Sequence, residues 1–275
     1  MAEAKQALVK TTPPPLVKLR KTNDSVSRGI TGIIYCPPGI GNTSLLRTVE
    51  PHYDSSDVLF INIDAGDAVI NDIEISTLDI SPSTDVRLMK AMYQQIVTGQ
   101  CKPRLVFLDS ISEMENYMRN IITSGRGKSF PTIKEFGDSA FKLREYLRLY
   151  RSLRDLGIDV IFCALEQDMD IQNDTNGVVT KCVPYVSKKM VIDVCAMVDF
   201  VAHMEKDDKT EVRWFRLESN DRFIAKKRFP WLEKFEKPSL GELMVKIKAG
   251  GSNKLPMELD PEGDKLARSL EGENK

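Results

Sequence analysis

The sequence predicts an α/β fold in which a mostly parallel central sheet is flanked by helices. Three observations lead to this prediction: apolar strand-like runs alternate with amphipathic segments, a glycine-containing loop follows the first strand, and a carboxylate directly follows a later strand. Near-continuous apolar strands require cover on both faces, which crossover helices supply. The 275 residues, 41% of them hydrophobic, suffice for one such domain.

The strands are expected in short apolar runs that end in polar or glycine-containing loops. The runs span residues 30–35, 57–63, 104–108, 159–164, 199–203 and 211–217. Between them, residues 85–97 and 133–156 have apolar side chains three or four positions apart, which is the period of a helix. In such sheets ligands bind beyond the carboxyl ends of the strands, so the loops there are the place to look for a site.

The two ends of the chain differ in composition from the middle. We expect a basic, proline-containing arm over residues 1–27, a core over 28–248 and a flexible acidic tail over 249–275. No apolar run is long enough for a membrane span and no secretory signal is visible, so a cytoplasmic location is expected. The net charge of −1 leaves any DNA contact to a local patch.

Cysteine and histidine usage gives no indication of a metal centre. The five cysteines show no Cys-x-x-Cys or Cys/His spacing, and the two histidines, His52 and His203, lie far apart in the sequence. This pattern predicts reduced thiols and structural or surface histidines rather than a zinc site.

The segment from Cys36 to Thr43, CPPGIGNT, has the layout of a phosphate-binding P-loop between a strand and a helix. Backbone N–H groups in such a loop point inward and hold phosphate oxygens. Thr43 occupies the position whose hydroxyl coordinates Mg²⁺. The alternative is a simple strand–helix turn. The residues expected to contact the nucleotide are Pro38, Gly39, Ile40, Gly41, Asn42, Thr43 and Ser44.

Two positions of this loop depart from the motif. The motif has Gly at position 36 and Lys at position 42, where this chain has Cys36 and Asn42. Asparagine donates a hydrogen bond but carries no charge, and losing one preorganised transition-state donor typically costs about 10²–10³ in rate. The loop therefore predicts ATP binding that survives better than ATP hydrolysis.

A second anchor is the run LVFLD, which ends at Asp109. Apolar residues followed by Asp form the Walker B pattern, in which the carboxylate at the strand end holds Mg²⁺. The pattern is weak alone, but its position after a phosphate loop strengthens it. Thr43 and Asp109 are therefore the predicted Mg²⁺ residues.

With these motifs the chain resembles the RecA-like ATP-binding proteins of phage genomes, which are grouped with AAA-type ATPases and include single-strand-annealing recombinases. The resemblance covers about residues 29–243 and includes IIYCPPGIGNTSLL, LVFLDSISEM and FIAKKRFPWLEKFEKPSLGEL. It implies a RecA-like P-loop NTPase core, ATP and Mg²⁺ as cofactors, and a homo-oligomeric ring or filament. It also implies a phage recombination or replication partner, and host cytoplasm as the location if the chain is phage-encoded.

The resemblance also assigns catalytic positions, several of which are altered here. The family's catalytic Glu aligns near Gly66, so Asp64 or Asp67 would have to replace it, and the sensor falls near Leu165, with Glu166 next to it. Lys226 and Arg228 match a Lys-x-Arg pair that reaches the neighbouring subunit's γ-phosphate, as an arginine finger does. The alternative for that pair is a solvated basic patch.

Single-stranded DNA is expected on two loops. The first, residues 123–129, carries Arg126 and Lys128, and the second, residues 168–181, is followed by Lys188 and Lys189. Ordinary solvated loops are the alternative. Two hypotheses follow: an ATP-binding protein that acts on single-stranded DNA with weak or absent hydrolysis, or a catalytically dead pseudo-ATPase that serves as an oligomeric scaffold.

Overall fold

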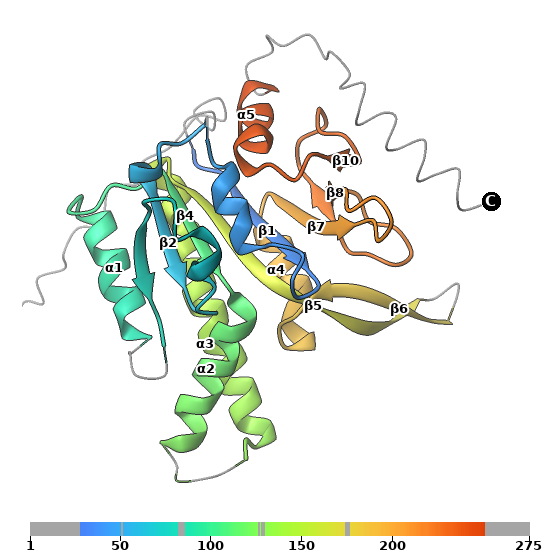
Figure 1. Ribbon diagram of the computed structural model, residues 1–275. Helices are drawn as coiled ribbons and strands as arrows, with labels where there is room; N and C mark the ends of the chain where they lie inside the picture. Colours follow the sequence, from blue (N-terminus) through green and yellow to red (C-terminus); the bar gives the residue numbers. More distant parts are fainter. Residues whose placement is uncertain are drawn as a thin grey trace, which may run out of the picture.

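The computed structural model describes residues 28–50, 52–81, 86–125, 127, 130–173 and 177–250. The described part of the chain forms a mixed α/β structure with a central sheet flanked by helices (Figure 1), which confirms the predicted fold class. The predicted arm over 1–27 and most of the predicted tail lie outside the described residues. The last helix continues to Gly250, two residues beyond the predicted limit of the core.

Six parallel strands form the body of the sheet, in the spatial order β3-β2-β4-β5-β1-β7. They are β1 (Thr31–Cys36), β2 (Val58–Asn62), β3 (Ser76–Asp79), β4 (Leu105–Asp109), β5 (Asp159–Asn173) and β7 (Phe200–Lys206). Antiparallel strands extend it: β8 (Arg213–Arg216), β9 (Lys226–Lys227) and β10 (Phe235–Glu236) on the β7 side, and β6 (Gly177–Pro184) along β5.

Successive residues of each central strand point to opposite faces, and each face has its own core. On β1, Ile33 packs with the cluster under α1 (Arg87–Val97), α2 (Ile111–Ser124), α3 (Ile133–Arg151) and α4 (Val191–Met197). The next residue, Ile34, packs on the other side, under α5 (Leu240–Gly250) and the short 3-10 helix at Thr43–Thr48. This explains why the central strands are apolar at nearly every position.

The helix predicted after the phosphate loop is a six-residue 3-10 helix, Thr43–Thr48. Two other local features differ from the sequence-based expectation. Helix α2 was not expected, although its N-cap Ser110, which accepts a hydrogen bond from the Glu113 backbone N–H, is a helix-start signal. The predicted loop over 168–181 is wrong for most of its length: β5 and β6 pair there as an antiparallel hairpin, from Glu166↔Pro184 to Asn173↔Gly177.

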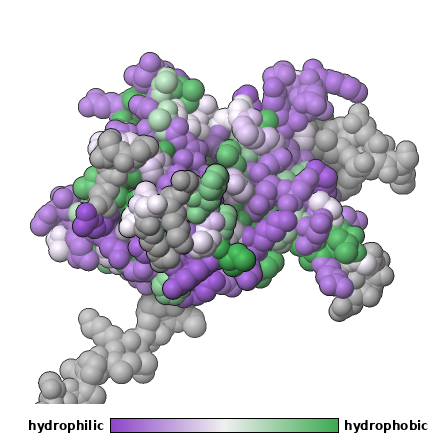
Figure 2. Space-filling view, turned by 90° about the horizontal axis from the view of Figure 1, so that it is seen from below, coloured by the Kyte–Doolittle hydropathy of each residue, from purple (hydrophilic) through white to green (hydrophobic). Residues whose placement is uncertain are grey.

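The surface of the described residues mixes polar and apolar side chains. No helix among them is long and apolar enough to cross a membrane. Seen from the end where α2 and α3 project, hydrophobic patches lie between hydrophilic ones (Figure 2). Large apolar side chains on this part of the molecule include Ile133, Phe136 and Phe141, all of them exposed on α3.

Candidate functional site

Two loops and two acidic strand residues meet at the carboxyl edge of the parallel sheet. In the strand register Asn62 of β2 lies opposite Asp109 of β4, and Cys36 of β1 lies opposite Leu165 of β5. The phosphate loop, the loop after β2, Asp109 and Glu166 therefore start from one edge. This is the position at which parallel α/β sheets bind ligands.

The phosphate loop is open at its tip. Gly39 and Gly41 adopt φ values of 82° and 115°, which side-chain-bearing residues rarely take. Among the described residues, the backbone N–H groups of Gly39, Ile40 and Gly41 have no hydrogen-bond acceptor, and nothing lies within 4 Å of the place a Gly39 Cβ would take. Unpaired backbone donors around an open turn fit a phosphate group.

Thr43 and Asp109 lie in direct contact beside this loop. The Thr43 hydroxyl donates to Asp109 Oδ2 at 2.6 Å. Gly66 closes over them: a Cβ at position 66 would lie 2.8 Å from Thr43 Oγ1, so the loop after β2 can approach only because residue 66 is glycine. A hydroxyl and a carboxylate oxygen are hard ligands of the kind that Mg²⁺ takes alongside substrate phosphates, so the residues present fit this ion.

Burial shapes the charge of this pair. Desolvation raises the pKa of Asp109 to about 6, against the lowering effect of the Thr43 hydrogen bond, and the nearby Asp64 carboxylate raises it further. Burial likewise raises the pKa of Asp64, whose Oδ1 accepts from Ser110 Oγ at 2.9 Å. Because the pKa values of both carboxyl groups are raised, a cation bound between them would stabilise their ionised forms.

This raised pKa predicts a pH-dependent difference between wild type and Asp109→Asn without Mg²⁺. The folded pKa lies above the unfolded one, so the folded state holds more protons and wild-type stability falls as pH rises from about 4 to 6. The free energy of unfolding of the variant should therefore rise relative to that of wild type by roughly 2 kcal/mol over that range. Urea denaturation at several pH values measures it; a difference that stays constant with pH would contradict the assignment.

The two residues that depart from the P-loop motif contact each other. The Cys36 thiol donates to Asn42 Oδ1 at 3.1 Å, and Asn42 Nδ2 donates to the Ala164 carbonyl of β5 at 3.3 Å. Burial raises the pKa of Cys36 to about 12, so the thiol is a proton donor at neutral pH. The Asn42 side chain thus joins the end of β1 to the middle of β5, where a lysine would extend toward phosphate.

Asn62, at the end of β2, holds the loop that carries Asp64 and Asp67, the predicted substitutes for the catalytic Glu. Asn62, buried at the end of β2, donates to Asp67 Oδ1 at 3.3 Å and Asp79 Oδ1 at 2.8 Å and accepts from the Gly66 N–H at 3.2 Å. Sequence reasoning missed Asn62, although a polar residue inside the apolar run VLFINI was a visible signal. Asn62 fixes the loop that carries Asp64 and Asp67.

Glu166 is engaged with side chains of β6 and β7. Its Oε2 lies 2.8 Å from His203 Nε2 and accepts from the Cys182 thiol at 3.3 Å. The hydrogen bond from His203 lowers the pKa of Glu166 despite partial burial. The catalytic role suggested for Glu166 stays a prediction.

Lys226 and Arg228 cap a helix of their own chain. Lys226 Nζ donates to the carbonyls of Cys195, Ala196 and Val198 at 2.7–3.0 Å, which are the unpaired acceptors at the end of α4. Arg228 donates to the Ala196 carbonyl and pairs with Asp199, each at 3.1 Å. Their role at a neighbouring subunit's phosphate stays a prediction.

The residues suggested for DNA divide between described and undescribed positions. Arg126 and Lys128 lie outside the described residues. Lys188 and Lys189 are exposed at the rim of a groove of about 490 Å³ between α2, α3 and the end of β6. Arg119 also lines this groove, with its guanidinium 4.4 Å above the Phe136 ring, and Tyr185 adds a second aromatic side chain.

Comparison with known families and proteins adds one positive finding. A family model described as an AAA domain matches residues 28–229, which is most of the chain. A search of curated proteins found no match to this sequence. The matched span begins just before β1 and ends after Arg228, so it contains the phosphate loop, Asp109 and the Lys226–Arg228 segment.

Proposed function

Because the chain belongs to the AAA domain family, we propose that it binds ATP with Mg²⁺ at the phosphate loop and hydrolyses it weakly or not at all. The observation that carries the proposal is the Thr43–Asp109 contact of 2.6 Å beside an open loop with unpaired N–H donors. This arrangement supports phosphate and cation binding without any lysine.

Each residue of the site has a distinct task in this proposal. The N–H groups of Gly39, Ile40 and Gly41 hold phosphate oxygens, and Thr43 and Asp109 hold the cation. Bound Mg²⁺ supplies positive charge that offsets the phosphates. Asn42 contributes none, because its amide is neutral and is hydrogen-bonded to Cys36 and Ala164.

Weak hydrolysis follows from the surroundings of the γ-phosphate position. Position 66 has no side chain, and Asp64 and Asp67 already accept hydrogen bonds from Ser110 and Asn62. A general base must reach the attacking water at hydrogen-bond distance. With neither a lysine nor an unengaged carboxylate in the loop after β2, binding is retained while the chemical step is slow.

Isothermal calorimetry of the full chain with Mg-ATP tests the binding proposal. We expect one site per chain and weaker binding when Mg²⁺ is removed by chelation. Absence of binding heat for ATP and ADP at several temperatures, with the protein folded by circular dichroism, would refute it.

We further propose that the protein acts on single-stranded DNA, as a homo-oligomeric ring or filament that works with a phage-type recombination or replication partner. The groove beside α2 and α3 supports this, because Lys188, Lys189 and Arg119 surround aromatic side chains on which bases can stack. In an oligomer, Lys226 and Arg228 would act on a neighbour's phosphate after leaving the end of α4.

Substituting Lys188 and Lys189 together by Ala is expected to weaken single-stranded DNA binding and to lower its salt slope by up to about 2, since each lost phosphate contact lowers it by about 1. Fluorescence anisotropy of a labelled oligonucleotide at several salt concentrations measures both. The matched control replaces Lys102 and Lys209, two exposed lysines elsewhere on the molecule. Equal losses in the two double variants would mean that only net charge matters.

A second candidate function is a catalytically dead scaffold, and a specific observation favours it. The two residues that depart from the motif, Cys36 and Asn42, are hydrogen-bonded to each other, and this bond stabilises the altered loop. Robust Mg²⁺-dependent ATP turnover by the purified protein alone would eliminate this candidate. Oligomer formation that does not depend on nucleotide would support it.

A further inference from the structure

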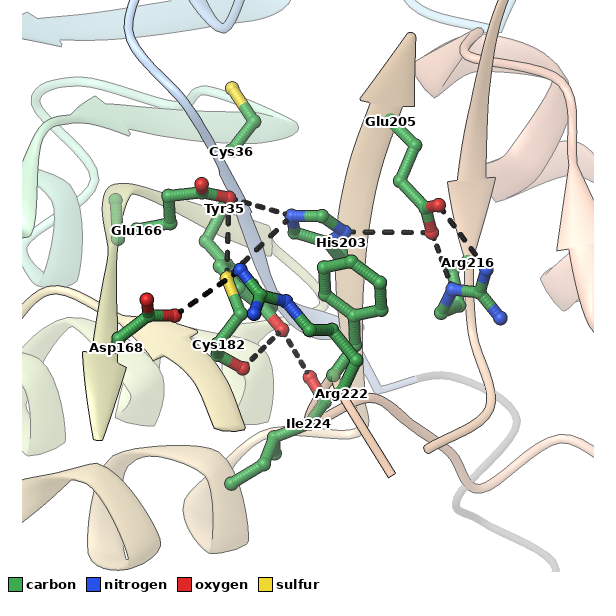
Figure 3. Close-up of polar contacts among 12 residues, drawn as sticks. Tyr35, Cys36, Glu166, Asp168, Cys182, His203, Glu205, Arg216, Arg222 and Ile224 are labelled. Atoms are coloured by element: carbon green, nitrogen blue, oxygen red, sulfur yellow. Dashed lines mark hydrogen bonds and ion pairs between the residues drawn. The ribbon is translucent and has the colours of Figure 1, made fainter. Parts of the chain in front are cut away.

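Three side chains from three strands converge on one point beside the phosphate loop. Glu166 lies on β5, Cys182 on β6 and His203 on β7 (Figure 3), and one ligand-type atom of each lies within 4.8 Å of the others. The separations are 2.8 Å between Glu166 Oε2 and His203 Nε2, 3.3 Å from that oxygen to Cys182 Sγ, and 4.0 Å from the sulfur to the imidazole nitrogen. No other group of this kind occurs within the described part of the chain.

From this arrangement we propose that Glu166, Cys182 and His203 form a binding site for a divalent transition metal of the zinc class. The donor set is one thiolate, one imidazole and one carboxylate, which are the three ligand types that Zn²⁺ combines. Mg²⁺ is a poor match, because it takes oxygen ligands only.

The distances suit a tetrahedral ion with small adjustments. Bond lengths of about 2.0–2.3 Å place neighbouring ligand atoms about 3.3–3.6 Å apart. The sulfur–oxygen separation already has this value, the oxygen–nitrogen pair must open by about 0.5 Å, and the sulfur–nitrogen pair must close by a similar amount. These shifts are within reach of side-chain rotation.

The histidine is oriented as a metal ligand requires. Its ring lies between Tyr35 and Phe223, with centroid separations of 4.7 and 4.2 Å. On the side opposite the cluster, Nδ1 lies 3.5 Å from Glu205 Oε1. Ligating histidines commonly direct their second nitrogen at a carboxylate, which fixes the tautomer and leaves Nε2 for the ion.

A further residue holds that carboxylate in turn. The Arg216 guanidinium donates to both oxygens of Glu205, with its Nη2 3.2 Å from Oε2. Arg216, Glu205 and His203 thus form a chain of contacts that ends at Nε2 (Figure 3). His203 Nδ1 is buried and, apart from the 3.5 Å contact to Glu205, has no hydrogen-bond partner among the described residues.

The cluster also offers an entry path for the ion and a place for a fourth ligand. His203 and Cys182 are buried, whereas the Glu166 side chain is 28% exposed, so an ion can enter past the carboxylate. Asp168 follows two residues later on the same side of β5, opposite Cys182, and is held only by an exposed contact of 3.6 Å to Arg222. Water or Asp168 can complete the tetrahedron.

The consequence of such a site is mechanical and separate from nucleotide binding. The ion would tie the base of the β5–β6 hairpin to β7 of the central sheet. Metal ligation requires loss of the Cys182 proton, so binding should release protons and weaken as the pH falls.

Cobalt titration of the stripped, nucleotide-free full chain tests the proposal, since a thiolate–Co²⁺ bond gives a near-ultraviolet charge-transfer band. We expect the band to saturate at one equivalent and to disappear when Zn²⁺ is added. Cys182→Ser should abolish it, whereas Cys195→Ser, a buried cysteine outside the cluster, should retain it. A folded wild-type protein without the band, or a band lost in Cys36→Ser but not in Cys182→Ser, would overturn the proposal.

Two variants guard against misfolding of Cys182→Ser. Glu205→Gln leaves all three ligands in place and should weaken Zn²⁺ binding about 10–100-fold, as loss of an outer-shell partner does. Glu166→Gln should lose the rise in melting temperature that Zn²⁺ gives to wild type. Metal affinity unchanged in both variants would contradict the assigned ligands and indicate that Glu166 and His203 form only an ion pair.

Discussion

Replacing Cys36 by Gly and Asn42 by Lys in one protein is expected to raise the rate of ATP hydrolysis about 10²-fold, the lower end of what one transition-state donor contributes. The two changes belong together because Asn42 accepts from the Cys36 thiol and donates to the Ala164 carbonyl. A lysine alone would leave that buried thiol without its acceptor. Phosphate release under saturating Mg-ATP measures the rate, and calorimetry measures the accompanying gain in affinity.

The single variant Cys36→Gly is the matched control, since it frees space at the end of β1 without adding charge. It should show no rate gain. If the double variant binds Mg-ATP more tightly but turns it over no faster, then the lack of a side chain at Gly66, and not Asn42, limits the reaction. If it neither binds nor turns over better, a lysine at position 42 does not reach the bound phosphates.

Thr43→Val is expected to remove most of the Mg²⁺-dependent part of ATP affinity, at least about 10-fold. The substitution replaces the hydroxyl that would bind Mg²⁺ by a methyl group of similar volume, which cannot bind a cation. The substitution also removes the donor to Asp109 Oδ2 and leaves that buried carboxyl without its partner. Calorimetry with ATP in the presence and absence of Mg²⁺ separates the two contributions.

Thr98→Val is its control, because the Thr98 hydroxyl bonds only to carbonyls of its own helix end, far from the sheet edge in sequence and structure. It should leave both affinities unchanged. An equal loss of affinity with and without Mg²⁺ in Thr43→Val would show that Thr43 contacts phosphate and not the cation.

Most of the parallel core could be predicted from the sequence because every parallel strand except β3 contains a short apolar run bounded by polar residues. Strands β1, β2 and β4 were expected within one residue of both ends, whereas β5 and β7 begin within one residue of the expected start but continue nine and three residues beyond the expected end. Strand β3 is largely exposed and polar, so its burial pattern carries no apolar signal. The β5–β6 hairpin was missed because its tip is polar, while the alternation that identifies it, with Met169 and Ile171 on β5, is short.

The two sites differ in how much of them local sequence reveals. The phosphate loop is contiguous, and Asp109 ends an apolar strand, so motif spacing was enough to pair Thr43 with Asp109. Glu166, Cys182 and His203 come from different strands, and their juxtaposition depends on strand order and hairpin register. No spacing rule for cysteine and histidine covers such a set, so this cluster could not be predicted from the sequence.

Strand β5 runs unbroken from Asp159 to Asn173, first as a central member of the parallel sheet and then as one arm of the hairpin. Fifteen residues in extended form span roughly 45 Å. The first part of this strand is held in the core, and the second part extends away from it as one arm of the hairpin. Two contacts lie where the strand leaves the parallel sheet and enters the hairpin. The Ala164 carbonyl accepts from Asn42, and Glu166 bonds to His203. Any rotation of β5 near Ala164 would displace the far end of the hairpin more than the residues beside the phosphate loop, because displacement grows with distance along the strand.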